Sequence, residues 1–463
     1  MTALWSALTL KKLANAESNK YWEASGIEID SRKVKKGDLF CAIKGEKNNG
    51  HDYIDYAFER GAIACLVNKD YNTDKEIAIS KVNNVIETLD LMAKDSRRRS
   101  KAKFIAITGS VGKTGTKDMI SLGLSGVADT YANESSYNNH LGVPLSLAKL
   151  PKKSDFCVLE LGMNKEGEIR ELAKLVKPEV AILTAIEQAH LKGLLTLKNI
   201  AKAKSEVLEC LPADGCLIIN SDTNYSEFII TKAKRIGIKN IITYGRKDGN
   251  NIKLVDYKIN KNQYSIKALC FGKKKSWLMP IVGEHWIYNS LSILALANYY
   301  QIDCEKIINR IYSFKVPEGR GNNIFLKFKN KNFLLIDDSY NSNPASLKAS
   351  LKNFSKLKVK GNKYLVLGDM LELGEKSLEI HKKFKEKIEN IDIDGLYTTG
   401  KNMFALNKVI CNVKYKVHEE NLEIITNKIL KLLQDGDAFL IKGSNSLNLN
   451  IIINQLVKAC NRL

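Results

Sequence analysis

The chain has 463 residues, which is too long for a single hydrophobic core and predicts about three domains. Its hydrophobic content of 44% is ordinary for a globular protein, and no apolar run approaches the ~18 residues of a membrane span. The formal net charge of +21 comes from basic residues spread along the whole sequence. We interpret it as a lysine-rich surface whose field attracts anionic substrates, and we expect neither nucleic acid nor a membrane as a partner.

Nine cysteines occur without a CxxC motif, and their number is odd. This usage is typical of buried thiols in a reducing compartment, so we expect a cytoplasmic protein without disulfides or a zinc site. The first fourteen residues are briefly apolar, but their lysines follow the apolar part instead of preceding it. We predict an amphipathic first helix there and no signal peptide.

Residues 1–98 are predicted to form a small α/β domain. Strand-like stretches at 37–45 and 63–69 flank a helix-like stretch at 51–62. The loop 45–52 is polar and contains glycine. Loops of this kind commonly hold ligands, and a plain connection is the alternative.

The middle domain, expected over 99–313, opens with a phosphate-binding loop. A buried strand at 104–108 precedes the turn Gly109-Ser110-Val111-Gly112, and a helix follows over 114–126. We expect the N–H groups of the turn to point inward and to bind phosphate together with the helix dipole. Lys113 adds a positive charge for the β/γ-phosphates, and the Thr114 hydroxyl can reach Mg²⁺.

The spacing of this loop departs from the common pattern. Two residues separate Gly109 from Gly112-Lys113, whereas the usual phosphate loop has four. An ordinary glycine turn with an exposed lysine is therefore the alternative interpretation.

Strands and helices alternate through the rest of the middle domain, which favours a mostly parallel sheet with helices on both faces. An antiparallel addition is expected at 265–283, and the apolar helix at 285–301 is expected to be buried. The further predicted strands lie at 155–162, 179–186, 215–222 and 240–245, with helices at 167–176 and 195–211 among them.

The third domain, expected over 314–463, repeats this alternation and is predicted to be Rossmann-like. Its first strand turn carries no GxGxxG, so a dinucleotide is not expected there. The predicted strands lie at 333–340, 363–370, 395–400 and 438–444, and each is followed by a helix.

Several polar groups fall where predicted strands end, which is where ligands bind in open α/β sheets. They are Glu160, His190, Asp337, Asp338 and Lys442, with Lys204 on a following helix. Each has a plain alternative, such as a structural His190, a solvated Lys204 or a turn-forming Asp338. Carboxylates beside a phosphate loop nevertheless indicate ATP-driven phosphoryl transfer.

An ordered set of motifs resembles the Mur ligases over nearly the whole chain. It comprises IDSRKVKKGDLFCAIKGEKNNGHDYIDYAFERGA, TGSVGKTGTK, ANESSYNNHLGVPLSL, LELGMNKEGEI, AILTAIEQAH, IAKAKSEV, GEHWIYNSL, VPEGRGN, IDDSYNSNPASLKASL and LVLGDMLELGEKSLEIH. The resemblance implies three α/β domains: a small uridine-nucleotide-binding domain, a central ATPase domain with a phosphate loop, and a C-terminal Rossmann-like domain.

Within the family, DDSYNSNP and LGDMLELGEKS resemble the members that add D-alanyl-D-alanine to UDP-N-acetylmuramoyl-tripeptide. The diaminopimelate- or lysine-adding members are the first alternative, but the Asp-Asn-Pro-Arg motif expected of them does not occur. A folylpolyglutamate synthase-like ligase is a remoter alternative, and a basic phosphate-loop protein acting on nucleic acid is the alternative from another class.

The resemblance assigns roles to individual residues. ATP would be bound by Gly109, Ser110, Val111, Gly112, Lys113, Thr114, Gly115, Asn289, Arg320 and Asp338. Mg²⁺ would be held by Thr114 and Glu160, and a second ion by His190 and a carbamylated Lys204. The substrate would contact Ser31, Arg32, Glu46, Lys47, Asn48, His51, Asn138, Asn139, Asn341 and Asn343.

The mechanism implied by the resemblance is stepwise: ATP converts a carboxylate to an acyl phosphate, which the acceptor amine then attacks. A monomer is expected. Two departures stand out. Gly115 replaces a more frequent threonine, and Asn445 replaces the arginine of the usual Lys-Gly-Ser-Arg-Ser, which puts the C-terminal substrate contacts in doubt.

Overall fold

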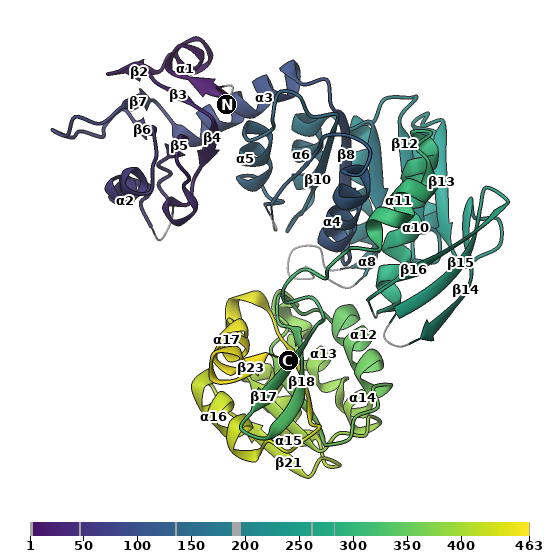
Figure 1. The fold of residues 1–463 in the computed structure, drawn as a ribbon. Helices are drawn as coiled ribbons and strands as arrows, with labels where there is room; N and C mark the ends of the chain where they lie inside the picture. Colours follow the sequence, from purple (N-terminus) through teal and green to yellow (C-terminus); the bar gives the residue numbers. More distant parts are fainter. Residues whose placement is uncertain are drawn as a thin grey trace.

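The computed structural model describes residues 3–45, 48–134, 137–187, 196–260, 263–281 and 283–462. These residues form three α/β domains, each built on its own sheet (Figure 1). Across these ranges, no helix is both long enough and apolar enough to cross a membrane.

The N-terminal domain contains a five-stranded sheet with the order β2-β7-β6-β5-β4. Its strands are β2 (Glu17–Ser18), β4 (Gly26–Glu28), β5 (Asp38–Cys41), β6 (Ala64–Asn68) and β7 (Ile79–Val82). The expected first helix is α1 (Ala7–Ala14), with the short strands β1 (Trp5–Ser6) and β3 (Glu23–Ala24) beside it. The helix expected at 51–62 is shorter, because a 3₁₀ turn over Gly50–Tyr53 precedes α2 (Ile54–Glu59).

The central domain contains a nine-stranded sheet with the order β16-β15-β14-β13-β12-β11-β8-β10-β9. Neighbouring strands are parallel from β9 to β14, and β14, β15 and β16 are antiparallel; the sequence predicted the antiparallel addition at β15 and β16 but not the strand β14. The strands are β8 (Lys103–Thr108), β9 (Thr130–Ala132), β10 (Phe156–Glu160), β11 (Val180–Leu183), β12 (Cys216–Asn220), β13 (Asn240–Gly245), β14 (Ile252–Asn260), β15 (Gln263–Cys270) and β16 (Lys273–Met279).

Helices cover both faces of this sheet because its central strands are apolar on both sides. In β8, Ile105 and Ile107 join the core under one face, whereas Phe104 and Ala106 join the core under the other. The first face carries α4 (Lys113–Leu124), the buried α10 (Glu284–Tyr299) and α11 (Cys304–Ile311). The second carries α5 (Gly142–Ala148), α6 (Glu168–Val176), α8 (Leu197–Lys204) and α9 (Ser226–Arg235).

The prediction of one continuous helix over 195–211 is wrong. Helix α8 ends at Lys204 and passes into the 3₁₀ helix η3 (Ser205–Cys210). The Ser205 hydroxyl donates to the carbonyl of Lys202, 2.7 Å away, which suits the tighter winding of such a helix end. Lys204 therefore lies at a junction instead of in the middle of a helix.

The C-terminal domain contains a seven-stranded sheet with the order β21-β20-β19-β22-β18-β17-β23. Its strands are β17 (Asn322–Phe328), β18 (Lys331–Asp338), β19 (Lys363–Gly368), β20 (Gly395–Thr399), β21 (Tyr415–His418), β22 (Ala438–Lys442) and β23 (Asn461–Arg462). Its helices are α12 (Pro344–Ser355), α13 (Ser377–Lys382), α14 (Lys385–Glu389), α15 (Lys401–Val409), α16 (Leu422–Leu432) and α17 (Asn450–Ala459). Strand β17 and the two edge strands β21 and β23 were not among the predicted elements, because none of them carries a long uninterrupted apolar run.

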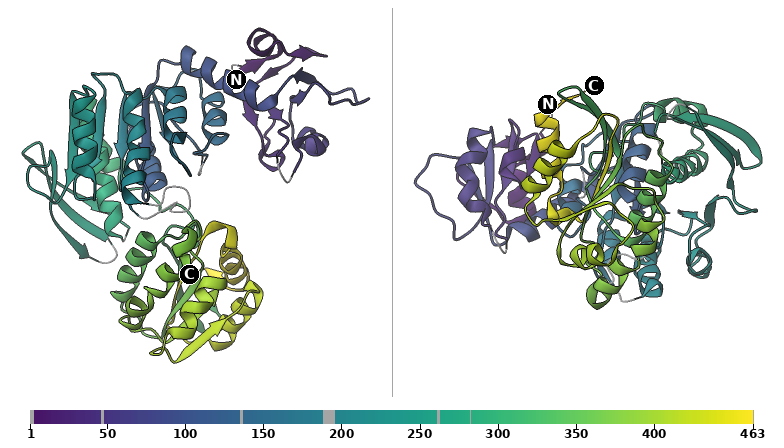
Figure 2. Two further views of the ribbon diagram at one scale, coloured as in Figure 1. Left: turned by 180° about the vertical axis from the view of Figure 1, so that it is seen from behind. Right: turned by 90° about the horizontal axis from the view of Figure 1, so that it is seen from below.

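Helix α3 (Val85–Arg99) joins the first two domains and packs against α1 on one side and α5 on the other. The N-terminal and C-terminal sheets adjoin different parts of the central domain (Figures 1 and 2). The C-terminal domain lies beyond the ends of β8 and β10, on the side where β8 leads into the phosphate loop, so this end of the central sheet faces a second domain.

Candidate active site

The predicted phosphate loop lies between β8 and α4. Gly109 has φ +152° and Gly112 has φ +85°, a region that L side chains rarely adopt. A Cβ on Gly109 would also lie 2.0 Å from the Thr184 hydroxyl oxygen, so this position requires glycine. The expectation that every N–H of the turn points inward is wrong for Ser110, whose N–H donates to the carbonyl of Ala185 at 2.7 Å.

Lys113 is the first residue of α4, and its ammonium donates to the carbonyl of Gly109 at 3.0 Å. Burial lowers the pKa of Lys113, and the nearby Glu160 carboxylate opposes that shift. The lysine thus curls over the loop, where a phosphate group would compete for its charge.

A hydrogen-bonded set of side chains surrounds Glu160 at the end of β10. The Thr114 hydroxyl donates to Glu160 Oε2 at 2.6 Å, and Asn138 Nδ2 donates to Glu160 Oε1 at 2.7 Å. Arg320, which precedes β17, donates from Nη2 to Thr114 Oγ1 at 2.9 Å. A hydroxyl and a buried carboxylate are oxygen ligands of the kind that Mg²⁺ prefers. The Thr114 hydroxyl already accepts from a cationic guanidinium, so these residues fit a cation.

Lys204 is 1% exposed. Burial, with a smaller contribution from Lys113, lowers its pKa well below the ordinary value for lysine. A lowered pKa favours the neutral amine, which is the form able to add CO₂, so the residue fits the expected carbamate. Its predicted partner His190 lies outside the described residues, and among those described no cluster of three His, Cys, Asp or Glu side chains offers another metal site.

A cleft of about 1670 Å³ brings most of the predicted ATP residues together between the central and C-terminal domains. Its walls include Ser110, Val111, Gly112, Lys113, Thr114, Gly115, Asn138, Asn139, Glu160, Asn289, Arg320, Asp338, Asn341, Asn343, Lys442 and Asn445. Two domains therefore contribute charged and polar groups to one space that is larger than a typical small-molecule pocket.

Two of the predicted ATP contacts present polar atoms to this cleft. Asn289 is 5% exposed on α10, and its Nδ2 is a buried donor for which the described residues provide no acceptor. Asp338 at the end of β18 pairs with Lys442 at 2.8 Å and accepts a hydrogen bond from the Ser350 hydroxyl at 2.5 Å. The first is a buried donor without a partner among the described residues, and the second is held by two polar contacts.

The unusual Gly115 has a steric explanation. A Cβ on Gly115 would lie 2.5 Å from the indole of Trp286 on α10. The indole is 2% exposed and cannot easily withdraw from this contact. The bulk of Trp286 thus requires a residue without a side chain on α4. This contact could not be predicted from local pattern, because the two positions are 171 residues apart.

Two predicted substrate residues already have local structural roles. The Asn139 side-chain oxygen accepts from the N–H groups of Leu141 and Gly142. Asn343 caps α12 in a reciprocal capping box with Ser346. Their contact with substrate remains a prediction.

The predicted substrate residues of the N-terminal domain that are described, Ser31, Arg32, Asn48 and His51, do not line this cleft. Arg32 is exposed and pairs with Asp30 at 2.8 Å. His51 Nε2 accepts from the N–H of Asn68, and its Nδ1 shares a hydrogen bond with Asn49 Oδ1, so the ring holds the loop together. Burial lowers the pKa of His51. Glu46 and Lys47 lie outside the described residues.

Comparison with known protein families gives matches along most of the chain. Residues 23–101 match "Mur ligase family, catalytic domain", residues 107–297 match "Mur ligase middle domain", and residues 325–445 match "Mur ligase, glutamate ligase domain".

Individual relatives are similar over nearly the full length. The UDP-N-acetylmuramoyl-tripeptide–D-alanyl-D-alanine ligase of Rickettsia prowazekii (strain Madrid E) is 32% identical and covers 97% of this chain and 99% of its own. The Bacillus subtilis (strain 168) protein of the same name is 31% identical, with 94% and 93% covered.

The fold has solved counterparts. The crystal structure of MurF from Acinetobacter baumannii matches with a TM-score of 0.81 at 27% identity, over 98% of this chain and 99% of that one. MurF ligase from Thermotoga maritima in complex with ADP matches with a TM-score of 0.76 at 24% identity, over 94% and 97%. The second likeness shows the fold alone.

Proposed function

This chain belongs to the Mur ligase family, and we propose that it joins D-alanyl-D-alanine to UDP-N-acetylmuramoyl-tripeptide with the hydrolysis of ATP. Relatives named UDP-N-acetylmuramoyl-tripeptide–D-alanyl-D-alanine ligase align with more than nine-tenths of the chain. The observation that carries the proposal is the cleft in which Lys113, Thr114 and Glu160 of one domain face Arg320 and Asp338 of another. The product would be the UDP-MurNAc-pentapeptide used for peptidoglycan, made in the cytoplasm.

We infer that ATP binds across this cleft. The phosphate loop and the Lys113 ammonium suit the β/γ-phosphates, and Arg320 reaches the same place from the C-terminal side. The unpartnered Asn289 Nδ2 suits an acceptor on the nucleotide, and Asp338 suits the ribose hydroxyls.

The chemistry proceeds in two steps because a carboxylate is a poor electrophile. The terminal carboxylate of the tripeptide first attacks the γ-phosphorus, so that ADP leaves and an acyl phosphate forms. The amine of D-alanyl-D-alanine then attacks the carbonyl carbon, loses a proton and expels phosphate. Lys113 and Arg320 offset the negative charge that gathers between the carboxylate and the γ-phosphate.

We propose that Thr114 and Glu160 hold Mg²⁺, and that a carbamylated Lys204 and His190 hold a second ion. Bound Mg²⁺ would supply further charge neutralisation at the transferred phosphoryl group. Asn138, which already fixes Glu160 by a hydrogen bond, keeps that carboxylate oriented toward Thr114.

The uridine nucleotide is assigned to the N-terminal domain, at Ser31, Arg32, Glu46, Lys47, Asn48 and His51. Asn138, Asn139, Asn341 and Asn343 would meet the rest of the substrate on its way to the cleft. We propose domain boundaries at 1–98, 99–313 and 314–463, and a monomer.

The test is phosphate release with ATP, UDP-MurNAc-tripeptide and a panel of amine acceptors. We expect turnover with D-alanyl-D-alanine and far less with meso-diaminopimelate or glutamate. Equal turnover with diaminopimelate as the acceptor and the matching UDP-MurNAc-dipeptide as the substrate would instead assign the protein to the diaminopimelate-adding ligases.

A further inference from the structure

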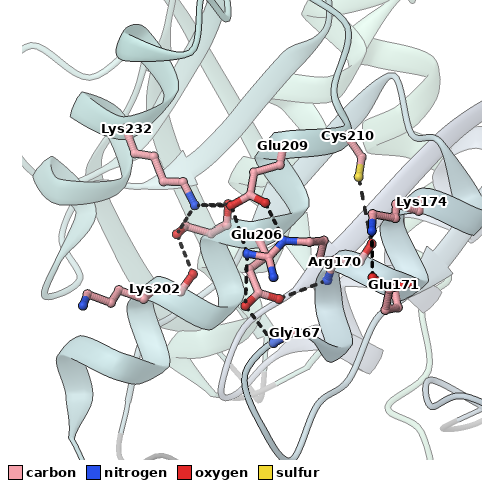
Figure 3. Close-up of polar contacts among 10 residues, drawn as sticks. Gly167, Arg170, Glu171, Lys174, Lys202, Glu206, Glu209, Cys210 and Lys232 are labelled. Carbon is pink, nitrogen blue, oxygen red and sulfur yellow. Dashed lines mark hydrogen bonds and ion pairs between the residues drawn. The ribbon is translucent and has the colours of Figure 1, made fainter.

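Glu206 is a buried carboxylate two residues beyond Lys204 that has no assigned part in the reaction. It lies in η3 and is 2% exposed. Its Oε1 accepts from the N–H of Gly167 at 2.8 Å, and its Oε2 accepts from the N–H of Arg170 at 3.1 Å (Figure 3). Both donors belong to the first turn of α6, so Glu206 caps that helix from a distant part of the chain.

The capped turn ends the segment that begins at Glu160. Residues 161–166 connect β10 to α6, and several of them line the cleft. Gly167, with φ +91°, is the N-cap residue of α6 and has no side chain with which to cap the helix itself. The N-terminus of α6 therefore depends on the carboxylate of Glu206 for its position.

An outer layer of charges surrounds this contact without touching the backbone of α6. The Arg170 guanidinium pairs with Glu209 at 2.6 Å and lies 3.8 Å from Glu206. Lys232 on α9 pairs with Glu209 at 2.8 Å and donates to the carbonyl of Ser205 at 3.2 Å (Figure 3). Glu209 is 32% exposed, so its ion pairs contribute less than the buried contacts of Glu206.

We propose that Glu206 is a positioning residue that sets Lys204 and Glu160 relative to each other. It joins the segment after Lys204 to the segment after Glu160 through two hydrogen bonds to backbone N–H groups, and it is buried behind the residues 162–167 that line the cleft. This inference rests on the proposed metal roles of Lys204 and Glu160. Groups that orient metal ligands from behind typically change metal affinity by 10–100-fold when they are removed.

The experiment is a titration of the full-length protein with Mn²⁺ in the presence of a β,γ-methylene analogue of ATP, followed by electron paramagnetic resonance of free Mn²⁺. We expect Glu206→Ala to weaken Mn²⁺ binding about tenfold or more. Glu206→Gln keeps an oxygen acceptor for one of the two N–H groups, so we expect an intermediate loss. Glu209→Gln is the matched control, because it breaks the outer ion pairs alone, and its affinity should stay within about twofold of wild type.

Circular dichroism at the assay temperature establishes that each variant is folded, and Glu206→Gln serves if Glu206→Ala is not. Wild-type Mn²⁺ affinity in a folded Glu206 variant, or an equal loss in Glu209→Gln, would overturn the inference. Lys204→Ala separates the two levels of the proposal. If it weakens Mn²⁺ binding and the Glu206 variants do not, the positioning role alone is wrong; if none of them changes binding, the proposed Lys204 metal site is wrong and the positioning role falls with it.

Discussion

The central domain meets its two neighbours in different ways. On the N-terminal side the two domains share one hydrophobic core, in which Leu145 and Ala148 of α5 pack with Trp5 and Leu10. The Trp5 indole donates to the carbonyl of Ala148 at 2.9 Å. Close-packed, interdigitated side chains of this kind prevent the two domains from sliding past each other.

A buried ion pair also holds together this interface between the N-terminal and central domains, which we call the fixed joint. Lys149 lies 2.7 Å from Glu28, whose side chain is 4% exposed and also accepts from the N–H groups of Ile29 and Asp30. The N-terminal domain is therefore held at a fixed angle to the phosphate loop.

The C-terminal side is mostly polar, apart from Phe314 at the domain boundary, which packs in the central core. The two hydrophobic clusters of the C-terminal domain include no residue of the central domain within the described ranges. The contacts across the cleft include the hydrogen bond from Arg320 to Thr114 and an ion pair of 3.5 Å between Lys352 and Glu284. Water can replace such contacts at little cost, so this is the joint that can open for substrates and close for chemistry.

The largest expected effect is on the fixed joint. Glu28→Ala leaves Lys149 without its buried partner and two N–H groups without their acceptor. We expect the free energy of unfolding to fall by about 3 kcal/mol, measured by urea unfolding with tryptophan fluorescence. ADP binding to the folded variant should be unchanged.

Glu134→Ala is the control for this change, because Glu134 lies 3.9 Å from the same lysine but is 55% exposed. It should cost less than about 1 kcal/mol. Similar losses in the two variants would show that the joint is not held by its buried pair.

Lys113→Ala should have the opposite effect: it should lower turnover and leave the free energy of unfolding nearly unchanged. It removes a positive charge from the preorganised phosphate site, and we expect turnover to fall by at least ~10²-fold in the phosphate-release assay. The urea midpoint should stay near wild type, because the hydrogen bond of the ammonium goes to the carbonyl of Gly109 within its own loop. Near-normal turnover would mean that the loop does not bind the reacting phosphates.

Lys204→Ala should lose most activity, at least the ~10-fold typical of losing a group that only orients a metal ligand, because the ligand itself is gone. Acetate in excess should restore part of it by supplying the missing oxygens. Lys204→Arg should be equally inactive and should not respond to acetate, since its side chain stays protonated and fills the space.

Lys202→Ala on the same helix is the matched control, because Lys202 is exposed. It should keep wild-type turnover. Full activity of Lys204→Ala without acetate would exclude the carbamate.

The smallest effect is expected at the interface that can open, between the central and C-terminal domains. Lys352→Ala removes an ion pair in which the lysine is 60% exposed and the glutamate 34%. We expect the free energy of unfolding to change by less than about 0.5 kcal/mol, measured by the same urea unfolding. A loss as large as that of Glu28→Ala would erase the distinction between the two joints.

The sequence predicted the parts of the fold that depend on local pattern. The apolar runs of the central strands and the glycines of the phosphate loop are local signals, and the structure confirms the strands and the turn. Strands such as β9, β17 and β23 lacked such a signal, because pairing with a neighbour is what makes them strands.

The site shows the same division. Motifs pointed to Glu160, Thr114 and Arg320, and the structure brings these three into hydrogen-bonded contact. Pattern alone could not reveal that Trp286 requires Gly115, or that Glu206 caps a helix 36 residues before it. Both depend on contacts between segments that are distant in the sequence.

The most direct test of the proposed chemistry follows oxygen atoms. UDP-MurNAc-tripeptide labelled with ¹⁸O in its terminal carboxylate is incubated with the protein, ATP and D-alanyl-D-alanine, and the inorganic phosphate is analysed by mass spectrometry. An acyl phosphate transfers one carboxylate oxygen to phosphorus, so we expect one ¹⁸O in each phosphate released and the other in the new amide. Unlabelled phosphate, or product formed without ADP, would contradict ligation through an acyl phosphate at this cleft.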